Sequence, residues 1–274
     1  MSSDTLDPFC GSIVAVSAEA LESDTANHNL RWGDYFIKFG DPSLLYEAKT
    51  QAYLYELAIR DPDAPIIPRV ITYFIHDYVA YLVSEFIDAP TIGTWLECTD
   101  PSQHALGYCA VANALDWLRR VPAPPDTLIG QLGGGPARHK LFKFTEAPLK
   151  FASIGAVERY VNKACEWIPS KFRPPPVSFS MEKSVFIQAD PTVGNFLVVR
   201  GRIVLIDFED VSLLPESFFT YMMNTTNGFV EKVAKYFPGE RSQNLPTMQA
   251  VKCVLQLHGG PTLGLNEHGY PVHK

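Results

Sequence analysis

The chain has 274 residues, of which 46% are hydrophobic, so it can bury the core of one large domain or of two lobes. Its formal net charge of −7 and its sequence pI of about 5.5 argue against a general nucleic-acid binder and against a protein that binds anionic membranes. The five cysteines are scattered and form no Cys-x-x-Cys pair, which is typical of reduced thiols in a cytoplasmic protein.

The sequence also carries no obvious targeting or membrane segment. No Lys or Arg precedes Arg31, so we expect no secretory signal with a charged start. The longest uncharged stretch, residues 101–115, is too short and too polar to span a bilayer. We therefore expect a cytoplasmic protein that has no membrane partner.

Residues 1–87 are predicted to form a small sheet with one helix, in the order β-β-α-β-β. The helix follows Asp41-Pro42-Ser43, a sequence typical of helix starts, and its apolar residues recur with a 3.6-residue period. Each predicted strand is a short run rich in apolar residues. The expected elements are strands at 12–16 and 34–40, a helix from 44 to 59, and strands at 69–75 and 79–87 with a turn near His76-Asp77.

Residues 88–274 are predicted to be mainly helical, with one inserted β-hairpin. The expected helices are at 102–120, 155–167, 216–236 and 245–257. A strand at 184–187 precedes the hairpin, whose strands at 195–199 and 202–206 are joined by a turn at Arg200-Gly201. The predicted fold class is therefore α+β, with a small β-rich lobe at 1–87 and a larger helical lobe at 88–274.

The segment FIQADPTVGNFLVVRGRIVLIDFED (186–210) carries two acids in unlike surroundings. Asp190 opens a polar turn that leads to Asn195, and Asp207 follows a buried apolar run. Because the strands between them are antiparallel, their far ends meet, and Asn195 is expected close to Asp207. Phosphoryl transfer needs one carboxylate at the acceptor hydroxyl and hard oxygen ligands for Mg²⁺ on the nucleotide phosphates. This segment supplies both kinds of group.

The motif D-P-T-V-G-N-F-L-V followed by I-D-F-E-D resembles the catalytic loop and metal-binding motif of the aminoglycoside-phosphotransferase-like kinases. These enzymes are small-molecule relatives of the protein kinases, whose own motifs are H-R-D-x-x-x-x-N and D-F-G. The resemblance extends over most of the chain, through YFIKFG, YEAKTQAYLYEL and YLVSEFI. The stretch LIGQLGGGPARHKLF is similar to a segment of small, mostly uncharacterised fungal members. The resemblance implies a bilobal protein-kinase-like fold, with a nucleotide-binding lobe at 1–87.

The resemblance also implies a role for each matching residue. Asp190 is then the catalytic base or the acid that orients the acceptor hydroxyl, and Asn195 and Asp207 hold Mg²⁺. The implied ATP-binding residues are Lys38 at the phosphates, Glu47 as the partner of Lys38, and Glu85 and Ile87 in the strand whose backbone receives adenine. The implied activity is phosphotransfer from ATP to a hydroxyl of a small molecule.

Ordinary structural roles stay open for several of these residues. Asp190-Pro191 is also compatible with an Asx-type turn, and Lys38 with a solvated lysine on a strand. Glu47 lies at the edge of the buried helix face, and Glu56 is an alternative partner for Lys38. Asp207 is harder to explain without a function, because a buried carboxylate costs free energy.

Three stretches depart from what the activity needs. A glycine-rich nucleotide loop is missing, because residues 12–33 supply Ser17 and the polar ESDTANHN, with glycine only at 11 and 33. Gln188 stands where the family has a histidine that braces the catalytic loop; its amide can still donate and accept, so we expect a tuned loop that stays active. Residues 130–138 have the glycine spacing of a P-loop but lack its Lys-Ser/Thr, so we expect a flexible loop near the acceptor.

Three classes of function are compatible with this sequence. The first is an ATP- and Mg²⁺-dependent kinase, and the second is a pseudoenzyme that binds a nucleotide, a metabolite or a protein partner. The third is the same fold with another chemistry. The acidic balance suits a cationic or hydroxyl-rich acceptor, such as an amino sugar or an amine alcohol. No histidine spacing indicates a zinc site, and no G-x-S-x-G indicates a serine hydrolase.

Overall fold

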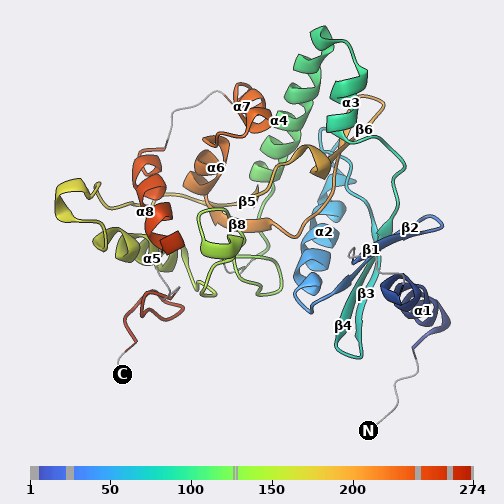
Figure 1. The fold of residues 1–274 in the computed structure, drawn as a ribbon, viewed down its shortest axis with the longest axis horizontal. Helices are drawn as coiled ribbons and strands as arrows, with labels where there is room; N and C mark the ends of the chain where they lie inside the picture. Colours follow the sequence, from blue (N-terminus) through green and yellow to red (C-terminus); the bar gives the residue numbers. More distant parts are fainter. Residues whose placement is uncertain are drawn as a thin grey trace.

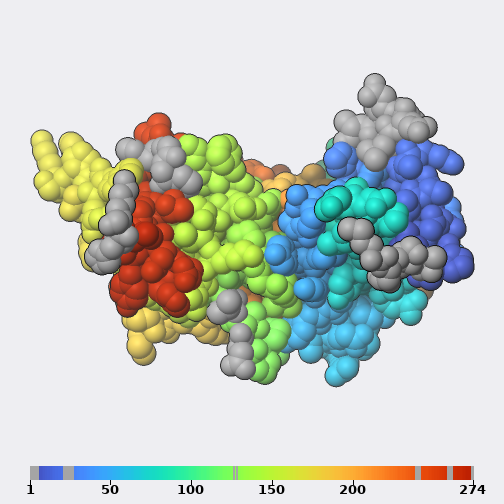
Figure 2. Space-filling view, turned by 90° about the horizontal axis from the view of Figure 1, so that it is seen from below, coloured from blue at the N-terminus to red at the C-terminus, as the bar shows by residue number. Residues whose placement is uncertain are grey.

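The computed structural model describes residues 6–22, 28–125, 127, 129–237, 242–257 and 262–272. Their arrangement is α+β: a four-stranded antiparallel sheet lies with two helices at one end, and a mainly helical region lies at the other (Figure 1). In space-filling form, residues coloured blue to cyan gather at one end and those coloured green to red at the other (Figure 2). Among the described helices, none is long and apolar enough to cross a membrane.

The four-stranded sheet has the order β1-β2-β4-β3, with antiparallel neighbours throughout. Its elements are β1 (Asn29–Trp32), β2 (Tyr35–Gly40), α2 (Leu44–Ala58), β3 (Val70–His76) and β4 (Val79–Glu85), preceded by α1 (Pro8–Glu22). Asp77 and Tyr78 join β3 to β4 with φ of 45° and 67°, as a two-residue hairpin loop of this kind requires. The three strands predicted after residue 33 and the helix at 44–59 are confirmed.

Residues 12–16 lie inside α1, so their prediction as a strand was wrong. The helix is capped at its start by Asp7, whose carboxylate accepts hydrogen bonds from two backbone N–H groups of the first turn, at 2.9 and 3.1 Å. Pro8 occupies the first helical position. Ile13 is fully buried and packs in one cluster with Ile37 of β2. The apolar run therefore serves a helix that covers the sheet, and the observed order is α-β-β-α-β-β.

The region after β4 combines helices with two small sheets. Its helices are α3 (Ile92–Cys98), α4 (His104–Arg120), α5 (Ile154–Glu166), α6 (Glu216–Met223), α7 (Gly228–Ala234) and α8 (Leu245–Leu257). The sheets pair β5 (Ser184–Gln188) with β8 (Val211–Pro215), and β6 (Phe196–Val199) with β7 (Arg202–Leu205). Short 3-10 turns are η1 (Pro101–Gln103), η2 (Lys143–Thr145), η3 (Ser170–Phe172) and η4 (Val193–Asn195).

Most elements predicted for this region are confirmed, with three differences. Helix α3 and strand β8 were not predicted, because seven and five residues are too few to display a clear period. The helix predicted at 216–236 is two helices. Asn227 separates them, because its side chain accepts a hydrogen bond from the N–H of Phe229 at 2.9 Å and caps α7.

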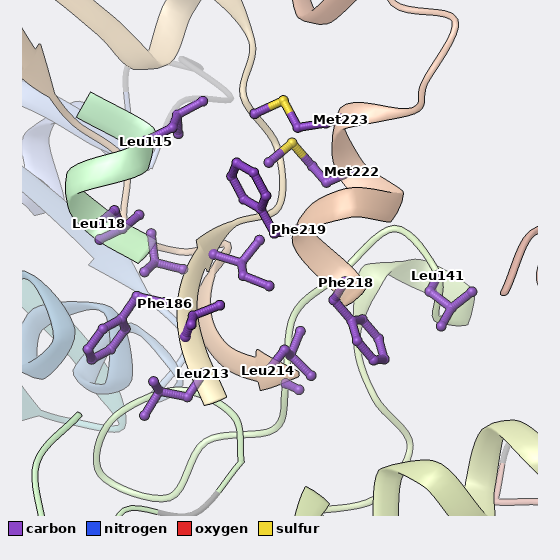
Figure 3. Packing of buried hydrophobic residues seen from close by; sticks show 14 of the residues in the cluster. Leu115, Leu118, Leu141, Phe186, Leu213, Leu214, Phe218, Phe219, Met222 and Met223 are labelled. Atoms are coloured by element: carbon purple, nitrogen blue, oxygen red, sulfur yellow. The ribbon is translucent and has the colours of Figure 1, made fainter. Parts of the chain in front are cut away.

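The larger core lies between the β5–β8 sheet and the helices α4 and α6 (Figure 3). Phe186 of β5, Leu213 and Leu214 of β8, Leu118 of α4 and Phe218 of α6 are each exposed by 1% or less. Burial of one such side chain stabilises the fold by roughly 1.5–3 kcal/mol. Since Gln188 pairs with Val211 at the end of this sheet, the core gives the segments after β5 and before β8 a rigid support.

The sheet at one end and the helical region at the other share this core. Leu54 of α2, and Ala64 and Ile67 of the segment after it, belong to the larger cluster. The N–H of Ile66 donates to the carbonyl of Ile203, and the N–H of Leu205 donates to that of Ile66, each at 2.9 Å. The segment after α2 thereby adds to the β6–β7 sheet. The lobe boundary near residue 88 stays a prediction.

His139 is a buried titratable group in this core. Its Nδ1 accepts from the N–H of Leu141 at 3.1 Å, and its Nε2 lies 3.2 Å from the carbonyl of Phe218. Since Nδ1 accepts, Nε2 carries the proton, and the ring is neutral. Burial lowers the pKa of His139 from 6.5 to about 3. The unfolded chain therefore binds one more proton than the folded chain between these two pH values.

This proton uptake predicts a loss of stability in acid. As pH falls below 6.5, His139 should cost the folded state about 1.4 kcal/mol per pH unit, or about 2 kcal/mol at about pH 5 relative to pH 7.5. Urea denaturation of wild type and His139→Gln over this range measures the effect, and the variant should lose this part of the slope. The exposed His268, replaced in the same way, is the control. Equal acid sensitivity of wild type and His139→Gln would contradict a neutral buried His139.

Candidate active site

The centre of the site is an ammonium group shared by two carboxylates. Lys38 Nζ of β2 lies 2.7 Å from Glu47 Oε1 of α2 and 2.8 Å from Asp207 Oδ1, in the segment after β7. Ile37 and Phe39 point into the core of the sheet, so the alternation of the strand turns Lys38 to the opposite face. Glu56, the other candidate partner, pairs instead with Arg60 at the surface.

Burial and charge act on this group in opposite directions. Burial lowers the pKa of Lys38, but the charges of Glu47 and Asp207 outweigh it, and the net shift is upward. Burial raises the pKa of Glu47, whose side chain is 3% exposed, and the Lys38 ammonium opposes that shift. Lys38 therefore stays charged, with its position fixed by two acids from different parts of the chain.

Asp207 has a strained backbone that several contacts hold in place. Its φ is +62°, in the left-handed region that residues with a side chain rarely occupy. Its carbonyl accepts from Gln188 Nε2 at 2.8 Å, and the N–H of the next residue, Phe208, donates to Glu47 Oε1 at 3.3 Å. Strain of this kind persists where the surroundings over-determine the conformation, and it gathers at functional sites. It turns the Asp207 carboxylate toward Lys38.

Gln188 braces the two segments that carry the predicted acids. Besides its bond to the Asp207 carbonyl, its Oε1 accepts from the N–H of Asp190 at 3.2 Å. The side chain is buried, and both ends of its amide are used. One glutamine thus joins the loop after β5 to the segment after β7.

The loop from Asp190 to Asn195 is closed by its own hydrogen bonds. Asn195 Nδ2 donates to the Asp190 carbonyl at 2.8 Å. The β6–β7 hairpin turns at Arg200-Gly201, with φ of 51° and 80°, as predicted. At the far end of the hairpin, the N–H of Ile206 donates to the carbonyl of Asn195 at 3.1 Å, which brings Asn195 beside the Asp207 segment.

A cavity of about 690 Å³ opens beside the Lys38 group, between the sheet and the helical region. Lys38, Glu47, Glu85, Ile87, Asn195 and Asp207, predicted as site residues, all line it; Asp190 does not. The N–H of Glu85 donates to the carbonyl of Arg69, whereas no described residue accepts from the N–H of Ile87. Apolar side chains of Leu82, Phe86, Leu197 and Ile206 form part of the wall. Volume and lining are those of a small-molecule site.

Two basic residues of this site were not predicted from the sequence. Arg138 lines the cavity and contacts three acids, Asp210, Glu209 and Glu146. Lys140 Nζ lies 2.6 Å from Asp190 Oδ1. The A-R-H-K run was visible in the sequence, but nothing there related it to acids some 50 to 70 residues further along the chain.

The glycine-rich stretch at 130–138, expected to be a flexible loop, is anchored on three sides. Gly130 pairs with Leu213 of β8 through two backbone hydrogen bonds, of 2.9 and 2.8 Å. Gln131 Nε2 donates to the Glu209 carbonyl at 2.8 Å, and the N–H of Leu132 donates to Thr50 Oγ1 of α2 at 3.3 Å. A Cβ at Gly130 would lie 2.3 Å from a backbone carbonyl oxygen, so the tight turn requires glycine. This anchoring places Arg138 in the wall of the cavity.

The donor set fits a magnesium nucleotide. Asn195 donates through Nδ2 and so keeps Oδ1 as an acceptor, and Asp207 uses one of its two oxygens for Lys38. Both residues line the cavity, and oxygen ligands are those Mg²⁺ prefers. No group of three or more His, Cys, Asp or Glu side chains in the described ranges could hold a metal alone. Such a site suits Mg²⁺, which shares its coordination with phosphate and water.

No protein-family model and no curated protein sequence matches this chain. Solved structures do match it. A thermostable mutant of the aminoglycoside phosphotransferase APH(4)-Ia, in its apo form, is similar with a TM-score of 0.51 and 15% identity, covering 83% of this chain and 79% of that one. The chain has the aminoglycoside phosphotransferase fold. A variant of APH(4)-Ia in a ternary complex with AMP-PNP and hygromycin B gives a TM-score of 0.50 at 15% identity, covering 88% of each chain.

Removal of Lys38 should destabilise the protein through the acids left behind. Lys38→Met leaves the Glu47 carboxylate buried without its ammonium, which should cost about 3 kcal/mol of unfolding free energy. Adding Glu47→Gln should recover part of that loss. Urea denaturation of the two single variants and the double variant measures this coupling. The exposed pair Glu56–Arg60, treated in the same way, should couple by less than about 0.5 kcal/mol. Additive effects of Lys38→Met and Glu47→Gln would contradict the buried ion pair.

Gln188 should be replaceable by histidine but not by an apolar residue. Gln188→Leu leaves the partly buried Asp207 carbonyl and Asp190 N–H without this partner, at a cost of about 2 kcal/mol. Gln188→His keeps one donor and one acceptor, so its cost should be below about 1 kcal/mol. Urea denaturation checks both values. A Gln188→Leu variant as stable as wild type would show that the brace contributes nothing.

Proposed function

We propose that this chain is an ATP- and Mg²⁺-dependent phosphotransferase that acts on a hydroxyl of a small molecule. One observation carries the proposal: Lys38, Glu47, Asp207 and Asn195 converge on a single cavity of about 690 Å³. A solved structure of this fold is a complex with AMP-PNP and hygromycin B. The proposal includes residues 1–87 as the nucleotide lobe, residues 88–274 as the catalytic and acceptor lobe, and a cytoplasmic location, in keeping with five unpaired cysteines.

On the nucleotide side, each residue has a distinct task. Lys38 neutralises charge on the phosphates, and Glu47 keeps its ammonium in place. The backbone of Glu85 and Ile87 receives adenine; the N–H of Ile87, which no described residue engages, is suited to this. Asn195 and Asp207 hold Mg²⁺, which neutralises charge that develops on the phosphate oxygens.

On the acceptor side, Asp190 acts on the hydroxyl. Its carboxylate is half-exposed and lies outside the cavity wall, at the end of the braced loop. It aligns the hydroxyl for attack and takes its proton late, because the transition state of phosphoryl transfer is loose. The protein therefore contributes position and charge, and forms no covalent bond with the substrate.

A nucleotide-binding pseudoenzyme is the second candidate, and α1 favours it. Gly11 lies inside this helix and Gly33 in the turn before β2, so neither belongs to a glycine-rich phosphate loop. A kinase without that loop holds the phosphates only through Lys38, the metal and the residues of the opposite wall. Such a site would bind a nucleotide more readily than it would transfer a phosphoryl group.

A thermal-shift titration with ATP and Mg²⁺ tests the proposal. A ligand at about 100 times its Kd stabilises the folded state by about 2.7 kcal/mol, so the melting temperature of wild type should rise by several degrees. Asp207→Asn should abolish the shift; asparagine tolerates the positive φ better than alanine does. The control is Asp88→Asn, which removes an exposed carboxylate from the same cavity wall.

Asp190→Asn separates the two candidates. For a kinase, this variant should bind ATP like wild type but form no phosphate ester from a mixture of hydroxyl compounds, as measured by mass spectrometry. A wild type that binds ATP and forms no ester is the pseudoenzyme. A wild type that shows no shift with ATP and Mg²⁺ refutes both nucleotide-binding candidates.

A further inference from the structure

The contact between Lys140 and Asp190 is a feature that phosphoryl transfer itself does not require. Lys140 Nζ lies 2.6 Å from Asp190 Oδ1, with 40% and 35% of the two side chains exposed. Neither residue lines the nucleotide cavity. The two charges therefore lie outside the cavity wall, and an acceptor that binds Asp190 also meets the Lys140 ammonium.

The backbone around Lys140 is fixed, so the lysine is positioned by the fold. The N–H of Arg138 donates to Ser212 Oγ of β8 at 2.8 Å. His139 is buried between hydrogen bonds to Leu141 and Phe218. Lys252 of α8 donates through Nζ to the Lys140 carbonyl. A surface lysine on a mobile loop has none of these supports.

Two ammonium groups lie close together here: that of Lys140 contacts Asp190, and that of Lys252 contacts the Lys140 carbonyl. Arg138 pairs with Glu146, Glu209 and Asp210 and offsets one of their three negative charges. Lys252 adds a second ammonium: burial and then the nearby charge of Lys140 lower the pKa of Lys252. In the described part of the chain, Asp190 is the single acid that Lys140 contacts.

An ammonium at this place discriminates between acceptors by charge. A hydroxyl that binds Asp190 also lies within a few ångströms of Lys140 Nζ. At such a distance, two like charges repel by about 1–4 kcal/mol, and opposite charges attract by as much. An amino sugar or an amine alcohol, suggested by the acidic balance of the whole chain, is disfavoured here. The charge beside Asp190, and not the net charge of the chain, then determines which acceptor binds.

We propose that the acceptor is a hydroxyl compound that carries a carboxylate or a phosphate, and that Lys140 binds this anionic group. This inference rests on the proposed phosphotransferase function and names its substrate class. Lys140 exchanges Asp190 for the acceptor anion, and the freed Asp190 carboxylate receives the hydroxyl. The acceptor oxygen then bonds to the terminal phosphorus, the bond to ADP breaks with its electron pair on the ADP oxygen, and Asp190 takes the hydroxyl proton.

Three sugars of one shape and different charge test the proposal: D-glucuronate, D-glucose and D-glucosamine. At equal ionic strength and with AMP-PNP and Mg²⁺ present, glucuronate alone should raise the melting temperature of wild type. Lys140→Met should lose this shift. The control is Lys171→Met in η3, which removes an ammonium that lies over the Phe172 ring. The glucuronate shift should persist in this variant. No shift with glucuronate, a larger shift with glucosamine, or an undiminished shift in Lys140→Met overturns the proposal.

Transfer of labelled phosphate from ATP to the same sugars supplies the second readout. Wild type should prefer glucuronate to glucosamine by about tenfold or more in kcat/KM, mainly through KM, and Lys140→Glu should reverse the order. If wild type transfers phosphate to glucosamine in preference to glucuronate, the anionic acceptor is refuted, but the phosphotransferase function is supported. Loss of the ATP shift in wild type, by contrast, refutes the phosphotransferase itself.

Discussion

The site depends on the two salt bridges that Lys38 makes with Glu47 and Asp207, because they join three segments that are distant in sequence. They connect a strand of the four-stranded sheet, the helix α2 and the end of the β6–β7 hairpin. A buried carboxylate such as Glu47 is costly without its partner, so the three segments have to meet for the fold to be stable. Stability and the shape of the cavity are therefore set by the same contact.

The strain at Asp207 follows from this constraint. Its positive φ is held by Gln188 from one side, while Lys38 pairs with the carboxylate. Because Gln188 also accepts from the N–H of Asp190, it holds the loop after β5 against the segment after β7. The glutamine in place of histidine still supplies one donor and one acceptor, which is all that the brace uses.

The sequence predicted those parts of the fold in which local pattern and tertiary packing agree. The helix after Ser43 and the hairpin at Arg200-Gly201 have strong local signals, and the hairpin places Asn195 beside Asp207. The apolar run at 12–16 was misread because its residues suit a strand and a buried helix face equally, and the Asp7-Pro8 start decides for the helix. Motif order could indicate Lys38 and Asp207, but no local pattern records the positive φ of Asp207.

The contacts of Lys140 and Arg138 could not be predicted from the sequence for a different reason. Asp190 lies 50 residues from Lys140 and Asp210 lies 72 residues from Arg138 along the chain, and these pairings depend on how the 130–138 stretch docks on β8. A run of basic residues in an acidic protein is by itself an ordinary solvated surface. The role of these basic residues depends on which acids they contact, and those contacts form only in the folded chain.

The charges around the cavity beside Lys38 are the reason that the proposed function includes a metal. Of the described residues on its wall, seven are acids, and the basic side chains apart from His28 are Lys38 and Arg138. Lys38 is already paired with two of these acids and Arg138 with two others, so the cavity repels a bare polyphosphate. A divalent cation held by Asn195 and Asp207, as proposed, would offset that repulsion. Under the proposed function, the metal would have to supply much of the attraction that a glycine-rich loop otherwise provides through its backbone N–H groups.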